Sequence, residues 1–298
     1  MSGSGGAVGF IGLGMMGLPM ARSLLRRGRS LVACDTSTEA RAALAEGATP
    51  GALRFVDDPA GLADAADIVV LMLPDSRVVA QVMEGAGGLL PVLRPGQLVI
   101  DMGSSLPGET RRLAALAAAR GAMVMDAPVS GSVVKARSGT LAIMAGGDDA
   151  AWAKAEPVLR DMGEALIRTG AVGSAHAMKA LNNYVYAAGL LATAEALRMA
   201  EAAGLDLAVF ADVLNASSGR NVATETKVKQ EILPGRYQGG FQLGLMRKDL
   251  ETAGTIAAET GFDARALELC RSLWADAVAA LGPKADNTEI HKVLGGGR

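Results

Sequence analysis

Gly12, Gly14 and Gly17 form a G-x-G-x-x-G triplet in which each glycine has its own physical role. Gly12 permits a tight turn out of a strand, Gly14 lets the backbone approach a pyrophosphate, and Gly17 lets a helix pack closely on the sheet. The amides at the start of that helix would face the phosphate charge. The other residues of this predicted cofactor turn are Leu13, Met15 and Met16.

Asp35 ends the second apolar run of the chain, residues 31–34, and lies about 20 residues beyond the glycine turn. A carboxylate at this point accepts both ribose hydroxyls of NAD and repels the 2′-phosphate of NADP. The pattern therefore favours NAD, and Arg41 is the nearby residue that could favour NADP instead. The simpler alternative is a glycine-rich turn that binds no ligand.

Lys179 and Asn183 lie four residues apart on an apolar, helical stretch, so their side chains should share one helix face. A charge on a buried helix is costly unless it is paired, so both side chains need partners. Alternatively, Lys179 extends to solvent and the asparagine bonds a neighbouring loop. The periodicity alone does not separate these alternatives.

Ser130, Gly131 and Ser132 follow the apolar run 123–126. At the end of a parallel strand, a serine beside a glycine offers a hydroxyl and backbone amides to a small anion. The alternative is an ordinary polar turn.

The elements that must position these residues follow from an alternation of short apolar runs and helical patterns between Ala7 and about Arg168. This alternation predicts an open parallel sheet with helices on both faces. The predicted strands are 9–11, 31–34, 68–73, 98–101, 123–126, 141–145 and 165–169. Because such sheets bind ligands at the carboxyl ends of their strands, the turns after the third, fourth and fifth strands should line one crevice with Gly12.

Helical patterns dominate after about residue 173. Residues 175–203 predict one long helix, and Asn182, Glu195 and Arg198 within it favour a buried helix linking two domains over a membrane span. The predicted organisation is a doubly wound α/β domain over 1–172 and an all-helical domain over 173–298. Three glycines mark predicted helix ends: Gly204, Gly261 and Gly282.

Composition excludes several classes of function. Half of the 298 residues are hydrophobic and the net charge is -2, which gives no electrostatic support for binding nucleic acid or an anionic membrane. Two cysteines, Cys34 and Cys270, indicate a reducing compartment, and we expect the cytoplasm. The two histidines, His176 and His291, have no ligand or nucleophile context, so we expect no metal. Residues 1–6 lack a signal-peptide pattern.

The chain resembles the β-hydroxyacid dehydrogenase family over nearly its whole length. Four blocks carry the resemblance: 9–21, 126–131, 170–183 and 241–250. This family includes 3-hydroxyisobutyrate dehydrogenase and tartronate semialdehyde reductase. The resemblance implies a Rossmann-type sheet, a long interdomain helix and a C-terminal domain like that of 6-phosphogluconate dehydrogenase. It also implies NAD-dependent interconversion of a short 3-hydroxy acid and its semialdehyde.

The resemblance implies roles for individual residues. Lys179 matches the catalytic lysine, Asn183 the amide that orients substrate, and Ser130 with Gly131 the substrate-binding turn. Hydride transfer requires proton movement at the substrate oxygen, which a positioned lysine would supply without a metal. The remaining matches are to cofactor-binding positions: Leu73, Pro74, Ser104 and Lys248.

Three departures from the family pattern bear on the substrate. Ser132 stands where a second glycine is common, Ala175 where glycine is frequent, and Gly103 where serine is frequent. The hydroxymethyl of Ser132 beside the expected carboxylate anchor would add a hydrogen bond or narrow the site.

Two other functions remain open at this point. Relatives of the same architecture reduce imines, although they generally replace the lysine that this chain keeps. A sensor that binds NAD without turnover is the alternative outside catalysis. Oxidative decarboxylation as in 6-phosphogluconate dehydrogenase is disfavoured, because those enzymes have a far longer C-terminal domain. The apolar helical half predicts a homodimer or homotetramer.

Overall fold

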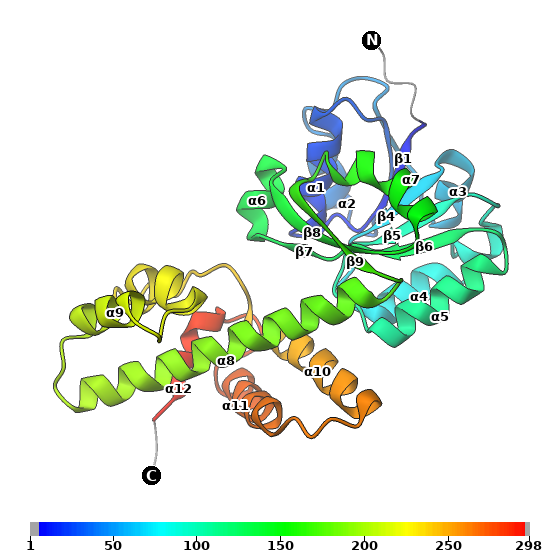
Figure 1. Ribbon diagram of the computed structural model, residues 1–298. Coiled ribbons are helices and arrows are strands. Elements are labelled where there is room, and N and C mark those ends of the chain that lie inside the picture. Colours follow the sequence, from blue (N-terminus) through cyan, green and yellow to red (C-terminus); the bar gives the residue numbers. More distant parts are fainter. Residues whose placement is uncertain (1–5, 296–298) are drawn as a thin grey trace. The chain divides into compact units, whose positions relative to one another are not determined.

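A mixed sheet forms the centre of the first of two compact units into which the chain divides after Lys179. The computed structural model describes residues 6–295, so the segment 1–6 discussed above lies outside it except for Gly6. The predicted domain limits, 1–172 and 173–298, stay a prediction. Figure 1 shows the chain with its elements labelled.

The sheet within the described residues has nine strands: β1 (Val8–Ile11), β2 (Leu31–Cys34), β3 (Leu53–Phe55), β4 (Ile68–Leu71), β5 (Leu98–Asp101), β6 (Met123–Asp126), β7 (Val129–Ser130), β8 (Leu141–Gly146) and β9 (Gly163–Gly170). Their order is β3-β2-β1-β4-β5-β6-β8-β7, and β9 pairs with β8. The ladders from β3 to β6 are parallel. The strand order steps from β1 to β2 on one side and from β1 to β4 on the other, which is the doubly wound arrangement predicted.

The sheet differs from the predicted open parallel sheet at one edge. Strand β8 is antiparallel to both β6 and β7, and β9 is parallel to β8. A short connection between β6 and β7 and a single short helix before β8 leave no long crossover to return the chain in the parallel direction. Strands β3 and β7 were not predicted; they have three and two residues, which is too short for a periodic pattern.

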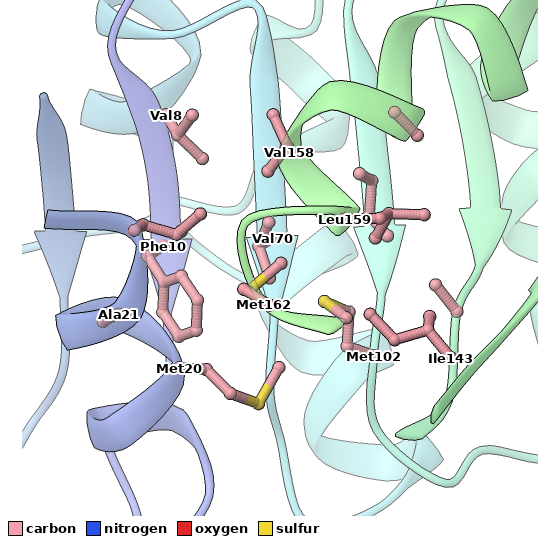
Figure 2. Close-up of a cluster of buried hydrophobic side chains, with 14 of the residues drawn as sticks. Val8, Phe10, Met20, Ala21, Val70, Met102, Ile143, Val158, Leu159 and Met162 are labelled. Atoms are coloured by element: carbon pink, nitrogen blue, oxygen red, sulfur yellow. The ribbon is translucent and has the colours of Figure 1, made fainter. Parts of the chain in front are cut away.

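Helices cover both faces of the sheet. The helices of this unit are α1 (Gly17–Arg26), α2 (Thr38–Ala45), α3 (Ala60–Ala65), α4 (Ser76–Glu84), the short η1 (Leu90–Val92), α5 (Pro107–Ala118), α6 (Ser132–Ser138) and α7 (Asp149–Leu159). Buried side chains of α1, α6 and α7 pack on one face. Figure 2 shows part of this core, with Phe10 of β1, Met20 of α1 and Leu159 of α7. Residues of α3, α4 and α5 form the core of the other face.

The rest of the chain is helical, as predicted. Its elements are α8 (Ser174–Ala202), α9 (Leu207–Ala216), the π-helix η2 (Thr224–Ile232), α10 (Leu243–Thr260), α11 (Arg265–Leu281), η3 (Asn287–Glu289) and α12 (Ile290–Val293). The core of the second unit is built around Trp274, which is fully buried. The predicted stops are confirmed, since Gly261 and Gly282 are the C-caps of α10 and α11 and Gly204 follows α8.

Both cysteines are free and buried. Burial raises the pKa of the Cys34 thiol, and it raises the pKa of Cys270 to about 11. Thiols with raised pKa are poor nucleophiles at neutral pH.

Candidate active site

The glycine turn lies between β1 and α1 and has the geometry that its three glycines predict. Gly12 has φ +95°, and a Cβ there would collide with the carbonyl oxygen of Met72. A Cβ on Gly17 would collide with the carbonyl oxygen of Gly12, so helix and turn touch through backbone. At Gly14 a Cβ would meet nothing within 4 Å. The turn therefore has no room for a side chain where it faces the sheet, and it has free space at Gly14. This free space suits a dinucleotide that approaches the start of α1.

Asp35 closes the turn from the end of β2. Its Oδ2 accepts a hydrogen bond from the Leu13 amide at 2.5 Å, and its Oδ1 accepts one from the Ser37 amide at 2.7 Å. Each carboxylate oxygen has a second lone pair for a ribose hydroxyl. Arg41 is engaged elsewhere, because its guanidinium pairs with Asp57 at 3.0 Å and lies 5.0 Å from the centre of the Phe55 ring.

The turns after β4 and β5 meet beside the glycine turn. A Cβ on Gly12 would lie 3.1 Å from Cδ2 of Leu73, and one on Gly103 would lie 2.9 Å from the carbonyl oxygen of Leu73. The structure therefore brings Leu73 and Pro74 to the same edge of the sheet as Gly12, with Ser104 next to Gly103. The lack of room beside Gly103 is the physical reason that glycine, rather than serine, fits there.

A hollow of about 640 Å³ adjoins the glycine turn. Leu13, Gly14 and Met15 form one side of it, and Val133 and Arg137 of α6 form another. Ser132 immediately precedes Val133 in the chain, but the residues of the predicted substrate turn do not line this hollow.

Ser130, Gly131 and Ser132 come after the parallel strand β6, as predicted, but the unpredicted short strand β7 lies between β6 and Gly131. Ser130 is the last residue of β7, opposite Ala142 of the antiparallel strand β8. Gly131 has φ +136°, and a Cβ there would lie 2.6 Å from Cδ of Lys135. Ser132 has φ +62°, a left-handed conformation that favours glycine. The serine at this departure from the family pattern is thus held in a strained backbone geometry.

Replacing Ser132 with glycine removes this strain. We expect S132G to raise the free energy of unfolding by about 1 kcal/mol, the typical cost of a left-handed non-glycine residue. Thermal unfolding measures this change, and Ser138→Gly in the last turn of α6 serves as the control, where we expect a loss of about 0.5 kcal/mol. A lower melting temperature for S132G would show that the hydroxyl makes a stabilising contact that outweighs the strain.

Lys179 lies in the second turn of α8 and is 9% exposed. Its side chain therefore does not extend into solvent. The first turn of α8 is anchored to β6. Asp126, at the end of that strand, is 0% exposed and accepts hydrogen bonds from the amides of Gly173 at 2.7 Å and His176 at 2.8 Å. A buried carboxylate thus caps the helix that carries the lysine.

In the second unit, Asp249 connects two of the predicted residues. Its Oδ2 accepts a hydrogen bond from Nδ2 of Asn183 at 2.5 Å, and its Oδ1 lies 3.9 Å from Nζ of Lys248. Asp249 is 2% exposed and Asn183 is 6% exposed. The buried carboxylate fixes the orientation of the asparagine amide, so that its Oδ1 faces away from Asp249.

Sequence patterns did not predict the buried hydrogen-bond acceptors Asp126 and Asp249 or the burial of His176. Asp126 and Asp249 lie inside the blocks that carry the family resemblance, but the resemblance implies no role for them, and no sequence context predicts one for His176. The sequence signal that could have identified them is a charged or titratable residue next to apolar positions. Such a residue is rarely buried without a partner, so its position indicates a buried hydrogen bond or ion pair. Residues 6–295 contain no group of three or more His, Cys, Asp or Glu side chains arranged to hold a metal ion.

Comparison with known proteins shows the family. Residues 7–173 match the NAD binding domain of 6-phosphogluconate dehydrogenase, and residues 173–294 match the family described as NAD-binding of NADP-dependent 3-hydroxyisobutyrate dehydrogenase. The chain is 38% identical to mitochondrial 3-hydroxyisobutyrate dehydrogenase of Mus musculus over 262 residues, 85% of this chain and 76% of the relative. The chain belongs to the β-hydroxyacid dehydrogenase family.

Other relatives of this β-hydroxyacid dehydrogenase cover most of its length. It is 37% identical over 247 residues to 2-(hydroxymethyl)glutarate dehydrogenase of Eubacterium barkeri, which is 83% of this chain and 80% of the relative. The solved structure of Mycobacterium tuberculosis 3-hydroxyisobutyrate dehydrogenase with L-serine superposes with a TM-score of 0.89 at 31% identity, over 98% of this chain and 99% of the other.

As a β-hydroxyacid dehydrogenase, the protein is an NAD(P)-dependent oxidoreductase of 3-hydroxy acids, as predicted. The matched families include both an NAD and an NADP description, so the family does not fix the nucleotide. Within the described part of the chain, no helix combines the length and the apolar character that crossing a membrane requires.

Proposed function

We propose that this enzyme interconverts a 2-substituted 3-hydroxypropanoate and the corresponding semialdehyde, with NAD as cofactor and Lys179 as the general acid and base. Burial of Lys179 one turn after the capped start of α8 carries this proposal. In the oxidation direction a neutral lysine accepts the proton of the substrate alcohol, and in reduction the ammonium returns it. Bound NAD supplies the hydride acceptor.

The substrate class follows from what the compounds named for the relatives share. The names 3-hydroxyisobutyrate, L-serine and 2-(hydroxymethyl)glutarate describe compounds with a primary alcohol on C3 and a carboxylate on C1. They differ in the substituent on C2, which is methyl, ammonium or carboxyethyl. We assign the carboxylate to the turn Ser130–Ser132, with the substituent toward Ser132, and we assign Asn183 and Ser130 to the reacting oxygen.

Oxidation of a panel of these acids tests the proposed function. The panel holds 3-hydroxyisobutyrate, L-serine, 3-hydroxypropionate and 2-(hydroxymethyl)glutarate, and lactate, a 2-hydroxy acid, is the control. We expect NADH formation with at least one panel member and none with lactate. Reduction of cyclic imines without oxidation of any panel acid would contradict the proposal.

We assign the cofactor preference to Asp35, because its carboxylate lies at the glycine turn while Arg41 is paired with Asp57. In D35N the amide still accepts a hydrogen bond, but the charge that holds the ribose and repels a 2′-phosphate is lost. We expect kcat/KM with NAD to fall about 10- to 100-fold, and kcat/KM with NADP to rise.

The matched control for this variant is Glu46→Gln, which removes an exposed carboxylate at the end of α2. It should change neither value by more than about twofold. An unchanged ratio of the two kcat/KM values in D35N would show that Asp35 only supports the backbone of the turn.

A further inference from the structure

A buried polar cluster surrounds the His176 ring in the first turn of α8. We define the His176 cluster as Asp101, Thr110, Asp126 and His176. All four are nearly inaccessible, with exposed fractions of 3%, 3%, 0% and 2%. They come from β5, α5, β6 and α8, all within the first unit. The catalytic roles proposed above use none of these side chains.

The two ring nitrogens of His176 face different partners. Nδ1 lies 2.8 Å from Oγ1 of Thr110, and that hydroxyl also lies 3.1 Å from the carbonyl oxygen of Leu106. Nε2 has no hydrogen-bond partner among the described residues and lies 3.9 Å from Oδ2 of Asp101. Nδ1 also lies 3.9 Å from Oδ2 of Asp126. The imidazole therefore fills the space between the ends of β5 and β6 and the start of α5.

Asp101 organises the loop that carries Ser104. Its Oδ1 accepts a hydrogen bond from the Gly103 amide at 2.9 Å, and its Oδ2 accepts one from the Ser105 hydroxyl at 2.6 Å. These bonds enclose Ser104 on both sides. The loop assigned to the cofactor is thus shaped by a carboxylate in contact range of His176.

The same histidine belongs to the helix turn that precedes Lys179. Its backbone amide donates to Asp126, its ring contacts Thr110, and Lys179 follows three residues later on the same helix. Residues three apart on a helix are neighbours on its surface. A shift of the first turn therefore moves the lysine, and misplacement of a reacting group by about 1 Å can lower a rate about 100-fold.

We propose that His176 is a positioning residue that fixes Lys179 relative to the Ser104 loop. This inference rests on the proposed role of Lys179. His176 does not touch substrate or cofactor in this proposal. It acts by holding the first turn of α8 against Thr110 and Asp101, so that the lysine stands at a constant distance from the loop after β5.

The test compares two replacements of the histidine. His176→Phe keeps a planar ring without nitrogen atoms, and His176→Asn keeps a nitrogen at the position of Nδ1. We expect H176F to lower kcat about 10- to 100-fold, with the dissociation constant for NAD changed by less than about twofold. H176N should keep kcat within about threefold of the original enzyme, because its amide still donates to Thr110.

A core variant away from the cluster separates positioning from loss of stability. Leu62→Ala opens a cavity between α3 and the sheet, because Leu62 is a fully buried residue of that helix. This variant should have a lower melting temperature, while kcat at 25 °C stays within about twofold. If H176F cannot be purified folded, Thr110→Val removes the partner hydroxyl and keeps the imidazole, and kcat should fall about three- to tenfold.

Each outcome decides the proposal. A selective fall in kcat for H176F or T110V, with rescue in H176N, supports it. Unchanged kcat in both H176F and T110V overturns it, as does a loss of kcat in L62A that matches the loss in H176F. Inactivity of the original enzyme on every acid of the panel is a different result, because it rejects the proposed function itself.

Discussion

Replacing Lys179 with methionine should lower kcat for alcohol oxidation by about 100- to 10,000-fold, the range over which general acid–base catalysis acts. Methionine has a similar length but cannot accept a proton. Because Lys179 belongs to α8 and the glycine turn to β1 and α1, the dissociation constant for NAD should change little. Steady-state kinetics combined with a direct NAD titration measures both values.

Two further variants sharpen this experiment. Lys179→Arg keeps a positive charge that no physiological pH removes, so its kcat should be as low as that of K179M if proton transfer is the role of the side chain. Lys154→Met removes a half-buried lysine of α7 whose Nζ donates to the Gly96 carbonyl, and it should leave kcat unchanged. Activity retained in K179R would show that the lysine contributes only its charge.

Truncation of Asp126 should produce the largest loss of stability. In D126A, the amides of Gly173 and His176 lose a fully buried carboxylate acceptor. Each hydrogen bond to a charged group contributes about 1.5–3 kcal/mol, so we expect a loss of about 3–5 kcal/mol in the free energy of unfolding. Urea unfolding monitored by circular dichroism measures it.

Asp148→Ala is the matched control for Asp126. Asp148 caps α7 through one hydrogen bond to the Ala151 amide at 2.8 Å, in a partly exposed setting. Loss of such a cap costs about 1 kcal/mol. If D126A and D148A are destabilised equally, the carboxylate of Asp126 is an ordinary cap, and the anchoring of α8 must come from other contacts.

Local sequence patterns predicted the parts of the fold that are encoded locally. The glycine turn, Asp35 and the strands β1, β2, β5 and β6 follow from spacing and from runs of apolar residues, and the long helix follows from its composition. Strand β3 has three residues, of which Arg54 is exposed, so no apolar run marks it. Strand β8 runs antiparallel to β6 and β7. This direction depends on pairing between strands, and the sequence of β8 alone does not show which strands it pairs with.

The hydrogen-bond partners in the candidate site could not be predicted for a related reason, because they lie far apart in the sequence. Asp126 bonds amides that are 47 and 50 residues away, and Asn183 bonds an aspartate 66 residues away. Periodicity identifies a buried face but not the partner of a buried charge. The roles of Lys179, Asn183 and Ser130 came from family resemblance, and they remain predictions that the experiments above test.

The antiparallel edge of the sheet carries the predicted substrate turn, apart from the strands that carry the predicted cofactor turn. Strand β7 pairs with β8, so Ser130 and Ala142 stand opposite each other and the segment between them leaves and rejoins the sheet at one place. The strands that carry the glycine turn and Asp35 are paired only with parallel neighbours on the other side. Residues 131–140 therefore lie between two antiparallel strands, and an exchange of this segment between family members leaves β1 and β2 intact but must preserve the packing of α6 against α1, where the Arg26 guanidinium donates to the Arg137 carbonyl at 2.6 Å.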